Sequence, residues 1–186
     1  MKRLRLFFLL VCKIENLHSK PPLGKMRLHA AGILFCDTKM VLLGRKKGLW
    51  TGFGGSLYPR EEPSHGAVRE ILEEIYGLFH AEDMVQKVLS FIPLGTPLSY
   101  SKGYVLYTLP FSALEEMSQL IAFAPHFPQG EIPKTLPNFL RAFRPLPHSE
   151  IHRLQCFSFS ALEKRTDIDL NLRLDLVSCA KWKVNK

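Results

Sequence analysis

One segment of the sequence, residues 64–76, combines an apolar stripe with a row of carboxylates. Pro63 and Ser64 supply a helix start signal, and Gly77 supplies a stop signal. The apolar residues recur at helical spacing and form one face: Ala67, Val68, Ile71, Leu72 and Ile75. The pattern therefore predicts a helix over residues 64–76 that buries this face and leaves the opposite face for chemistry.

Three carboxylates lie on that opposite face. Glu70 and Glu74 are one turn apart, and Glu73 is adjacent to both. Carboxylates crowded in this way repel one another, and no contact in a core would offset that repulsion. A hard divalent cation would offset it, because Mg²⁺ or Mn²⁺ prefers carboxylate oxygens and bridges to substrate phosphates. For a Glu-Glu pair taken alone, a solvated helix face rich in glutamate is the alternative.

The complete spacing of this segment resembles the Nudix box, Gly-x5-Glu-x7-Arg-Glu-U-x-Glu-Glu-x-Gly-U, where U is aliphatic. Ile71 occupies the aliphatic position, and the chain matches the first glycine and every charged position with Gly55, Glu61, Arg69, Glu70, Glu73 and Glu74. The departure lies at the end, where Tyr76 occupies the glycine position and Gly77 follows one residue late. We expect this to change how the helix terminates and to leave the carboxylate spacing intact.

The rest of the chain is consistent with this resemblance. The sequence predicts strands at 27–36, 40–44, 103–111 and 154–159, helices at 112–121 and 170–184, and glycine-rich loops at 45–48 and 51–55. Ser112 and Glu115 have capping-box spacing. Residues 124–147 contain six prolines and predict a long irregular loop. The resemblance implies an α/β fold, a sandwich of helices around a mixed sheet, in a domain over residues 27–186.

The resemblance also implies a reaction, the metal-assisted attack of water on a phosphoanhydride in a nucleoside diphosphate linked to another group. By motif position, Glu70, Glu73, Glu74 and the carbonyl of Gly54 would hold one or more Mg²⁺ ions, or Mn²⁺ in their place. Arg69 would orient the carboxylates, reaching Glu73 at i, i+4, and Glu61 would tie the loop to the helix. The general base stays open between Glu70 and a carboxylate outside the box, for which Glu150 is the candidate.

The composition limits the cellular compartments in which such a protein is expected to act. No run approaches the ~18 to 20 apolar residues of a membrane-spanning helix, and the longest, 6–12, has seven. That run follows three basic residues as in a signal peptide, but charged residues stand where the cleavage site should be, so a first strand fits better. Four widely separated cysteines favour reduced thiols. We therefore expect a cytoplasmic protein.

Charge bears on the substrate. The net charge is +8, with seven basic residues and one acidic residue in 1–28, whereas residues 55–90 are net negative. An acidic island in a basic protein is typical of a cation site for a polyanionic substrate, and residues 1–26 form a basic extension or an extra strand. Further substrate contacts are expected from residues that stack on a base or hold phosphates: Arg45, Lys46, Lys47, Trp50 and Glu150.

For these residues ordinary alternatives stay open: a solvated turn for the cations and a buried position for Trp50. Phe139, Arg141, Phe143 and Arg144 interleave rings and cations, as RNA-binding segments do. The leading substrate is capped or 5′-phosphorylated RNA, consistent with a likeness to Nudix proteins of large DNA viruses. A triphosphate of an oxidised purine is the alternative, favoured by the glycine-rich turn beside Trp50. A non-catalytic module that binds nucleotide or RNA is the alternative of another class.

Overall fold

A computed structural model describes residues 28–178, apart from 96, 98, 102 and 129–130. The predicted basic extension, the predicted first strand and the end of the predicted last helix lie outside the described residues. Within the described part of the chain, no helix combines the length and the apolar character that crossing a bilayer requires.

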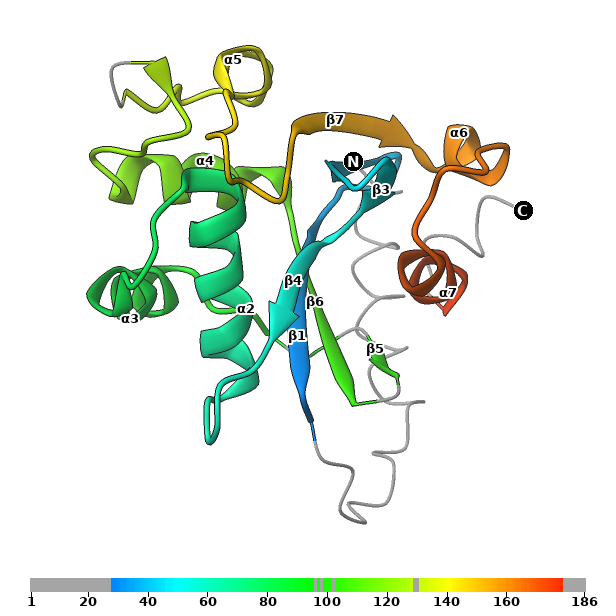
Figure 1. Ribbon diagram of the computed structural model, residues 1–186, viewed down its shortest axis with the longest axis horizontal. Helices are drawn as coiled ribbons and strands as arrows, with labels where there is room; N and C mark the ends of the chain where they lie inside the picture. Colours follow the sequence, from blue (N-terminus) through cyan, green and yellow to red (C-terminus); the bar gives the residue numbers. More distant parts are fainter. Residues whose placement is uncertain (1–27, 96, 98, 102, 129–130, 179–186) are drawn as a thin grey trace, which may run out of the picture.

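Two sheets form the middle of the molecule (Figure 1). The larger is mixed and has the order β4-β1-β6-β5, in which β1 runs parallel to β6 and antiparallel to β4. The smaller has the order β3-β2-β7 and is antiparallel. The strands are β1 (Ala30–Phe35), β2 (Met40–Lys46), β3 (Leu49–Thr51), β4 (Phe53–Ser56), β5 (Ser99–Ser101), β6 (Tyr104–Leu109) and β7 (Arg153–Ser158).

Helices cover the strands from both sides. In Figure 1, α2, α3 and α4 lie on one side, and α6 and α7 lie on the other. The helices are α2 (Pro63–Ile71), the π-helix η1 (Leu72–Tyr76), α3 (Glu82–Phe91), α4 (Phe111–Leu120), α5 (Leu136–Ala142), α6 (Phe159–Glu163) and α7 (Leu170–Ser178). The expected α/β class with a mixed sheet is therefore confirmed.

The alternation of side chains along β1 explains why there are two cores. Ile33 and Phe35 belong to the cluster that includes α2, whereas Leu34 and Cys36 belong to the cluster that includes α7. Successive residues of a strand point to opposite faces, and both faces are covered here. This is why the sequence of β1 is an almost continuous apolar run. The packing of Ile33 and Phe35 also places α2 on the sheet that carries the glycine-rich segment.

That glycine-rich segment was predicted as loop, and the structure corrects this. Residues 53–56 form β4, and Arg45 and Lys46 belong to β2 rather than to a loop. The physical reason is close packing of two backbones: a Cβ on Gly54 would lie 2.6 Å from the Cα of Gly32 on β1. Glycines here permit close strand pairing as well as unusual backbone angles.

The proline-rich region is also more ordered than predicted. Residues 136–142 form α5, with Pro137 in its first turn, where a missing N–H costs nothing. Phe139 and Phe143 are buried, so they pack in the core instead of offering stacking surfaces. The capping box was wrong as well, because α4 begins after Pro110 without a side-chain cap and Glu115 accepts a hydrogen bond from the N–H of Leu136 at 3.2 Å. Helices α3 and α6 and strands β3 and β5 were not predicted.

Candidate active site

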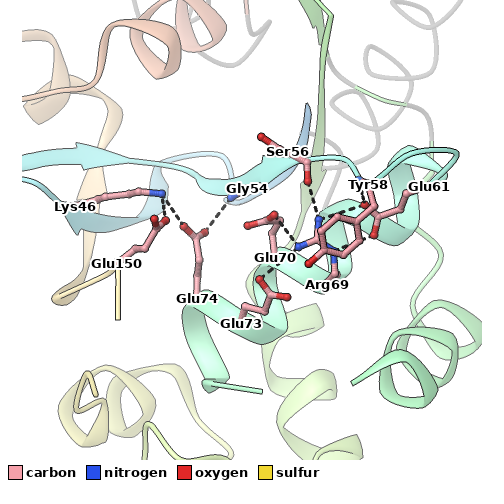
Figure 2. Close-up of polar contacts among 10 residues, drawn as sticks. All are labelled: Lys46, Gly54, Ser56, Tyr58, Glu61, Arg69, Glu70, Glu73, Glu74 and Glu150. Atoms are coloured by element: carbon pink, nitrogen blue, oxygen red, sulfur yellow. Dashed lines mark hydrogen bonds and ion pairs between the residues drawn. The ribbon is translucent and has the colours of Figure 1, made fainter. Parts of the chain in front are cut away.

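Helix α2 and its π-helical continuation η1 carry the predicted site. All five residues of the predicted apolar stripe are buried in the core beneath the sheet. This orientation turns Glu70 and Glu74 toward β4, whereas Glu73 lies beside Arg69 (Figure 2). The close approach is steric as well as electrostatic, because a Cβ on Gly55 would lie 2.5 Å from Oε2 of Glu70. The glycine of the box therefore makes room for a carboxylate.

Arg69 binds three of the four box carboxylates. Its Nε donates to Oε1 of Glu61 at 2.9 Å, and its Nη1 donates to Oε1 of Glu70 at 2.8 Å and Oε2 of Glu73 at 3.3 Å. Its Nη2 donates to the carbonyl of Ser56 at 2.7 Å and to Oε2 of Glu61. The predicted pairs of Arg69 with Glu73 and Glu61 are thus present, and we call this arrangement the Arg69 clasp.

Glu61 ties the loop after β4 to the helix, as expected from its motif position. Its Oε2 also accepts a hydrogen bond from the N–H of Tyr58 at 2.8 Å. These bonds to Arg69 and Tyr58 outweigh burial and lower the pKa of Glu61, although burial is the largest single influence. The Tyr58 ring, itself half exposed, lies over the Arg69 guanidinium at 4.2 Å.

Glu74 has a different environment, one helical turn beyond Glu70 and outside the clasp. Its Oε2 accepts from the N–H of Gly54 at 2.9 Å, and its Oε1 lies 3.5 Å from Nζ of Lys46. Lys46 also forms an ion pair with Glu150 and so bridges two carboxylates (Figure 2). Glu74 is 6% exposed, and burial raises its pKa to about 8, against the opposing effects of Lys46 and the Gly54 N–H.

These side chains suit a hard cation by chemistry. Glu70, Glu73 and Glu74 are carboxylates on one helix, and burial raises the pKa of Glu70 as well as that of Glu74. A divalent cation would stabilise the ionised form of both. Among the described residues, no three His, Cys, Asp or Glu side chains are grouped as they would be around a metal ion. Arg69, Lys46 and the Gly54 N–H engage the carboxylates instead. Gly54 thus contributes its N–H to the site, and ligation by its carbonyl stays a prediction.

The end of the helix accommodates the departure from the box. Two residues separate Glu74 from Gly77 where the Nudix pattern has one, and the last turn, Leu72–Tyr76, is π-helical. A π-helical turn closes from i to i+5 and takes one residue more than an α-helical turn. Gly77 then ends the helix in the left-handed conformation, with φ of 71°, as its position predicted.

The structure places the predicted substrate residues in different surroundings. Trp50 is 2% exposed and packs against Phe157 with ring centroids 4.7 Å apart. Of the two alternatives for Trp50, base stacking or a buried position, the structure therefore has the buried position. Arg45 lies over the Trp50 ring and forms an ion pair with Asp167, which holds it outside the carboxylate cluster. Lys46 lies inside the cluster, and Lys47 is exposed.

Sequence reasoning missed two contributors to the site. The carbonyl of Ser56 accepts from Arg69, and Tyr58 lines a cavity of about 220 Å³ together with Arg69 and Glu73. The box pattern specifies neither residue type, so only the path of the chain after β4 reveals them.

Comparison with known proteins agrees with this geometry. The NUDIX domain family matches residues 26–169. Two solved structures share 14% identity with the chain. A hydrolase of the NUDIX family from Clostridium perfringens has a TM-score of 0.44 and covers 86% of this chain and 99% of its own. A bifunctional NMN adenylyltransferase/ADP ribose pyrophosphatase from Francisella tularensis, complexed with AMP and a manganese ion, has a TM-score of 0.42 and covers 91% of this chain and 45% of its own.

No curated protein matches the chain. The family match covers more than half of the sequence, and it includes the box and every residue of the Arg69 clasp. The chain therefore belongs to the NUDIX domain family and is a Nudix pyrophosphohydrolase.

Proposed function

We propose that this protein is a Mg²⁺-dependent Nudix hydrolase that cleaves a phosphoanhydride bond in capped or 5′-phosphorylated RNA. The observation that carries the proposal is the crowding of three carboxylates on one helix beside β4: Glu70 lies against Gly55, Glu74 accepts from the N–H of Gly54, and Glu73 shares Arg69 with Glu70. Such a carboxylate set has a use in binding a cation that bridges to substrate phosphates, and none in a core.

Glu70, Glu73 and Glu74 would hold the cation, with Mg²⁺ the first choice and Mn²⁺ able to replace it. When bound, such a cation polarises phosphoryl oxygens and lowers the pKa of water, so that a nucleophile exists near neutral pH. The Arg69 clasp fixes Glu70 and Glu73 before any cation arrives, because each gives one oxygen to Nη1 of Arg69. The helix is thus organised in advance of binding.

Two carboxylates remain candidates for the general base. Glu70 lies within the clasp, where burial raises its pKa although the bond to Arg69 favours its ionised form. Glu150 is 60% exposed and is paired with Lys46, so it lies beside the carboxylate cluster and is open to solvent. Its position supports a role at the reacting water, since a base must reach the proton that it removes. The choice between them is open to test by substitution of each.

The charge of the chain favours a polymeric substrate. A net charge of +8 exceeds what one nucleotide needs, and much of it lies in residues 1–28. Attraction of this kind adds affinity through the release of counterions and weakens steeply with salt. Lys47 adds an exposed cation at the turn after β2, beside Lys46.

The experiment compares three substrates in the presence of Mg²⁺: capped RNA, 8-oxo-dGTP and dinucleoside polyphosphates. We expect release of m7GDP from capped RNA that declines with salt and with the triple change Lys2→Gln, Arg3→Gln and Arg5→Gln. Changing the exposed Lys39, Lys134 and Lys164 to Gln removes the same charge elsewhere and serves as the matched control. Hydrolysis of 8-oxo-dGTP that is insensitive to salt and to the triple change would favour the nucleotide substrate. Saturable binding without turnover would indicate a non-catalytic module.

A further inference from the structure

A buried histidine outside the box connects the end of the catalytic helix to a distant loop. His126 is fully buried. Its Nδ1 lies 3.0 Å from the carbonyl oxygen of Ile75, in the last turn of η1, and its Nε2 lies 2.8 Å from Oγ of Ser149. The ring also packs edge-on against Phe143, with centroids 5.3 Å apart. Both nitrogens of this side chain are therefore engaged.

The chemistry of the partners fixes the direction of both bonds. A carbonyl oxygen can only accept, so Nδ1 of His126 carries the proton and donates to Ile75. Burial lowers the pKa of His126, so the ring is neutral near pH 7 and Nε2 is an acceptor. The hydroxyl of Ser149 therefore donates to Nε2. The result is a directed chain from Ser149 through His126 to the helix end.

Ser149 is the junction between this chain and the loop before β7. Its Oγ accepts from the N–H of Leu146 at 3.0 Å, and its own N–H donates to the carbonyl of Leu146 at 3.0 Å. The loop is also attached at its start, where the N–H of Arg144 donates to the carbonyl of His126 at 2.7 Å. These bonds hold the loop backbone in place between Arg144 and Ser149, the residue before Glu150.

The other side of Glu150 is attached to the sheet. Ile151 is fully buried, and the N–H of His152 donates to the carbonyl of Arg45 on β2 at 2.9 Å. Glu150 is thus an exposed carboxylate on a backbone fixed on both sides, and it pairs with Lys46, which in turn approaches Glu74. Through Ser149 and His126, hydrogen bonds connect this backbone to the end of the helix that carries the carboxylates.

We propose that His126 and Ser149 are positioning residues that hold Glu150 against Lys46 and Glu74 for hydrolysis. This inference rests on the proposed function. The extra residue at the end of the box contributes, because the π-helical turn and Gly77 shape the surface against which His126 packs. A Cβ on Gly77 would lie 2.9 Å from Cδ2 of the His126 ring.

Ser149→Ala tests the link while leaving the histidine in place. The change removes the hydroxyl that joins the loop to His126, and we expect kcat to decline about fivefold with KM changed less than twofold, a loss confined to the transition state. Ser149→Thr keeps a hydroxyl and should restore most of the rate. Unfolding of each variant by heat shows whether the comparison is made on folded protein.

A matched control separates positioning from stability. Ser118→Ala removes another buried hydroxyl, which bonds to Tyr76 and the Leu114 carbonyl and lies away from the loop before β7. We expect it to lower the unfolding temperature comparably and to leave kcat unchanged.

The decisive measurement is a double-mutant cycle with Glu150→Gln. If Ser149 acts through Glu150, then Ser149→Ala has no further effect on kcat once Glu150 is changed. Equal effects of Ser149→Ala in both backgrounds, or a normal rate for Glu150→Gln, would overturn the inference while leaving the hydrolase intact. Absence of turnover by the wild-type protein would instead overturn the proposed function and this inference with it.

Discussion

The carboxylates of the box are held in two different ways, which divide the site into two halves. The first half is the Arg69 clasp, in which Arg69 donates hydrogen bonds to Glu61, Glu70 and Glu73. The second half is Glu74, which is buried with one N–H donor and a lysine 3.5 Å away. The first half contains a guanidinium in direct contact with its carboxylates, whereas the second still favours an added positive charge.

The pKa values of the carboxylates refine this contrast. In the clasp the pKa of Glu61 is lowered and burial raises that of Glu70, whereas for Glu74 burial raises the pKa to about 8. A buried carboxylate with a raised pKa gains most from a cation, because ionisation is what burial penalises. The comparison teaches that the clasp shapes the helix while Glu74 is the position at which an added cation has the greatest effect.

The largest expected effect tests the second half directly. Glu74→Gln removes the charge and keeps the shape, so the protein should fold while its turnover declines about a hundredfold or more, the scale of ~2.7 kcal/mol for a lost transition-state interaction. Steady-state kinetics with saturating Mg²⁺ measure the rate, and circular dichroism checks the fold. Glu70→Gln should behave similarly.

The control for this change is Glu163→Gln on α6, an exposed glutamate outside the site. We expect it to leave the rate unchanged. A rate for Glu74→Gln equal to that of Glu163→Gln would contradict the assignment of Glu74 to the metal site.

The next effect tests the first half. Arg69→Lys keeps a positive charge but cannot reproduce the planar fork that serves Glu61, Glu70 and the Ser56 carbonyl together. We expect a loss of about 2 kcal/mol in the free energy of unfolding, since removing one partner of a buried pair leaves the others uncompensated. Urea denaturation measures it. Arg153→Lys, at an exposed arginine on β7, is the matched control, and equal stability of the two variants would show that the clasp contributes little.

The sequence predicted the position and the buried face of the helix better than the shape of its last turn. The apolar stripe, the contacts of Arg69 and the stop at Gly77 all follow from residues within one local segment, where helical periodicity and motif spacing suffice. The π-helical turn was not predicted, although the extra residue before Gly77 was visible. Within this turn the Tyr76 hydroxyl contacts the backbone of Leu114 and the hydroxyl of Ser118, both far away in the sequence, and no local pattern encodes such contacts.

Segments whose structure depends on distant partners were predicted poorly. Helix α5 lies in a proline-rich region without periodicity and is held by burial of Phe139. Strand β4 has two glycines, which read as loop, because pairing with β1 is invisible locally. The position of Glu150 beside Lys46 is a contact between residues 104 positions apart, and no local pattern encodes it.

A smaller effect tests whether the second half depends on the buried tyrosine. Tyr76→Phe keeps the ring against Phe139 and Phe127 but removes the hydroxyl that lies 3.3 Å from the Leu114 carbonyl and from Oγ of Ser118. We expect the free energy of unfolding to decline by about 1 kcal/mol, the usual value for one buried hydrogen bond. The rate should stay at the wild-type level, and a large loss of activity would show that this anchor also shapes the carboxylates.

The smallest expected effect is on the pH dependence of stability. It comes from His126, which contacts the end of the helix beyond Glu74. Burial lowers the pKa of this ring more than its bond to the Ile75 carbonyl raises it, whereas the unfolded chain has the ordinary value of 6.5. Below pH 6.5 the unfolded state therefore binds more protons at this position than the native state. By linkage, the contribution of neutral His126 to stability is fully present above pH 6.5 and is lost as the pH declines toward the native pKa.

His126→Asn removes this titration while keeping a donor for the Ile75 carbonyl. The variant should be less stable than the wild type at pH 7.5, because the bond to Ser149 is lost. The difference in the free energy of unfolding should then shrink between pH 7.5 and pH 5.5, since acid destabilises the wild type alone at this position. Urea denaturation of the metal-free proteins at several pH values measures it. Tyr76→Phe, which removes no group that titrates in this range, should run parallel to the wild type. Parallel curves for His126→Asn would mean that the ring is not held neutral by burial, and the helix end would then lack the fixed acceptor that orients Ser149.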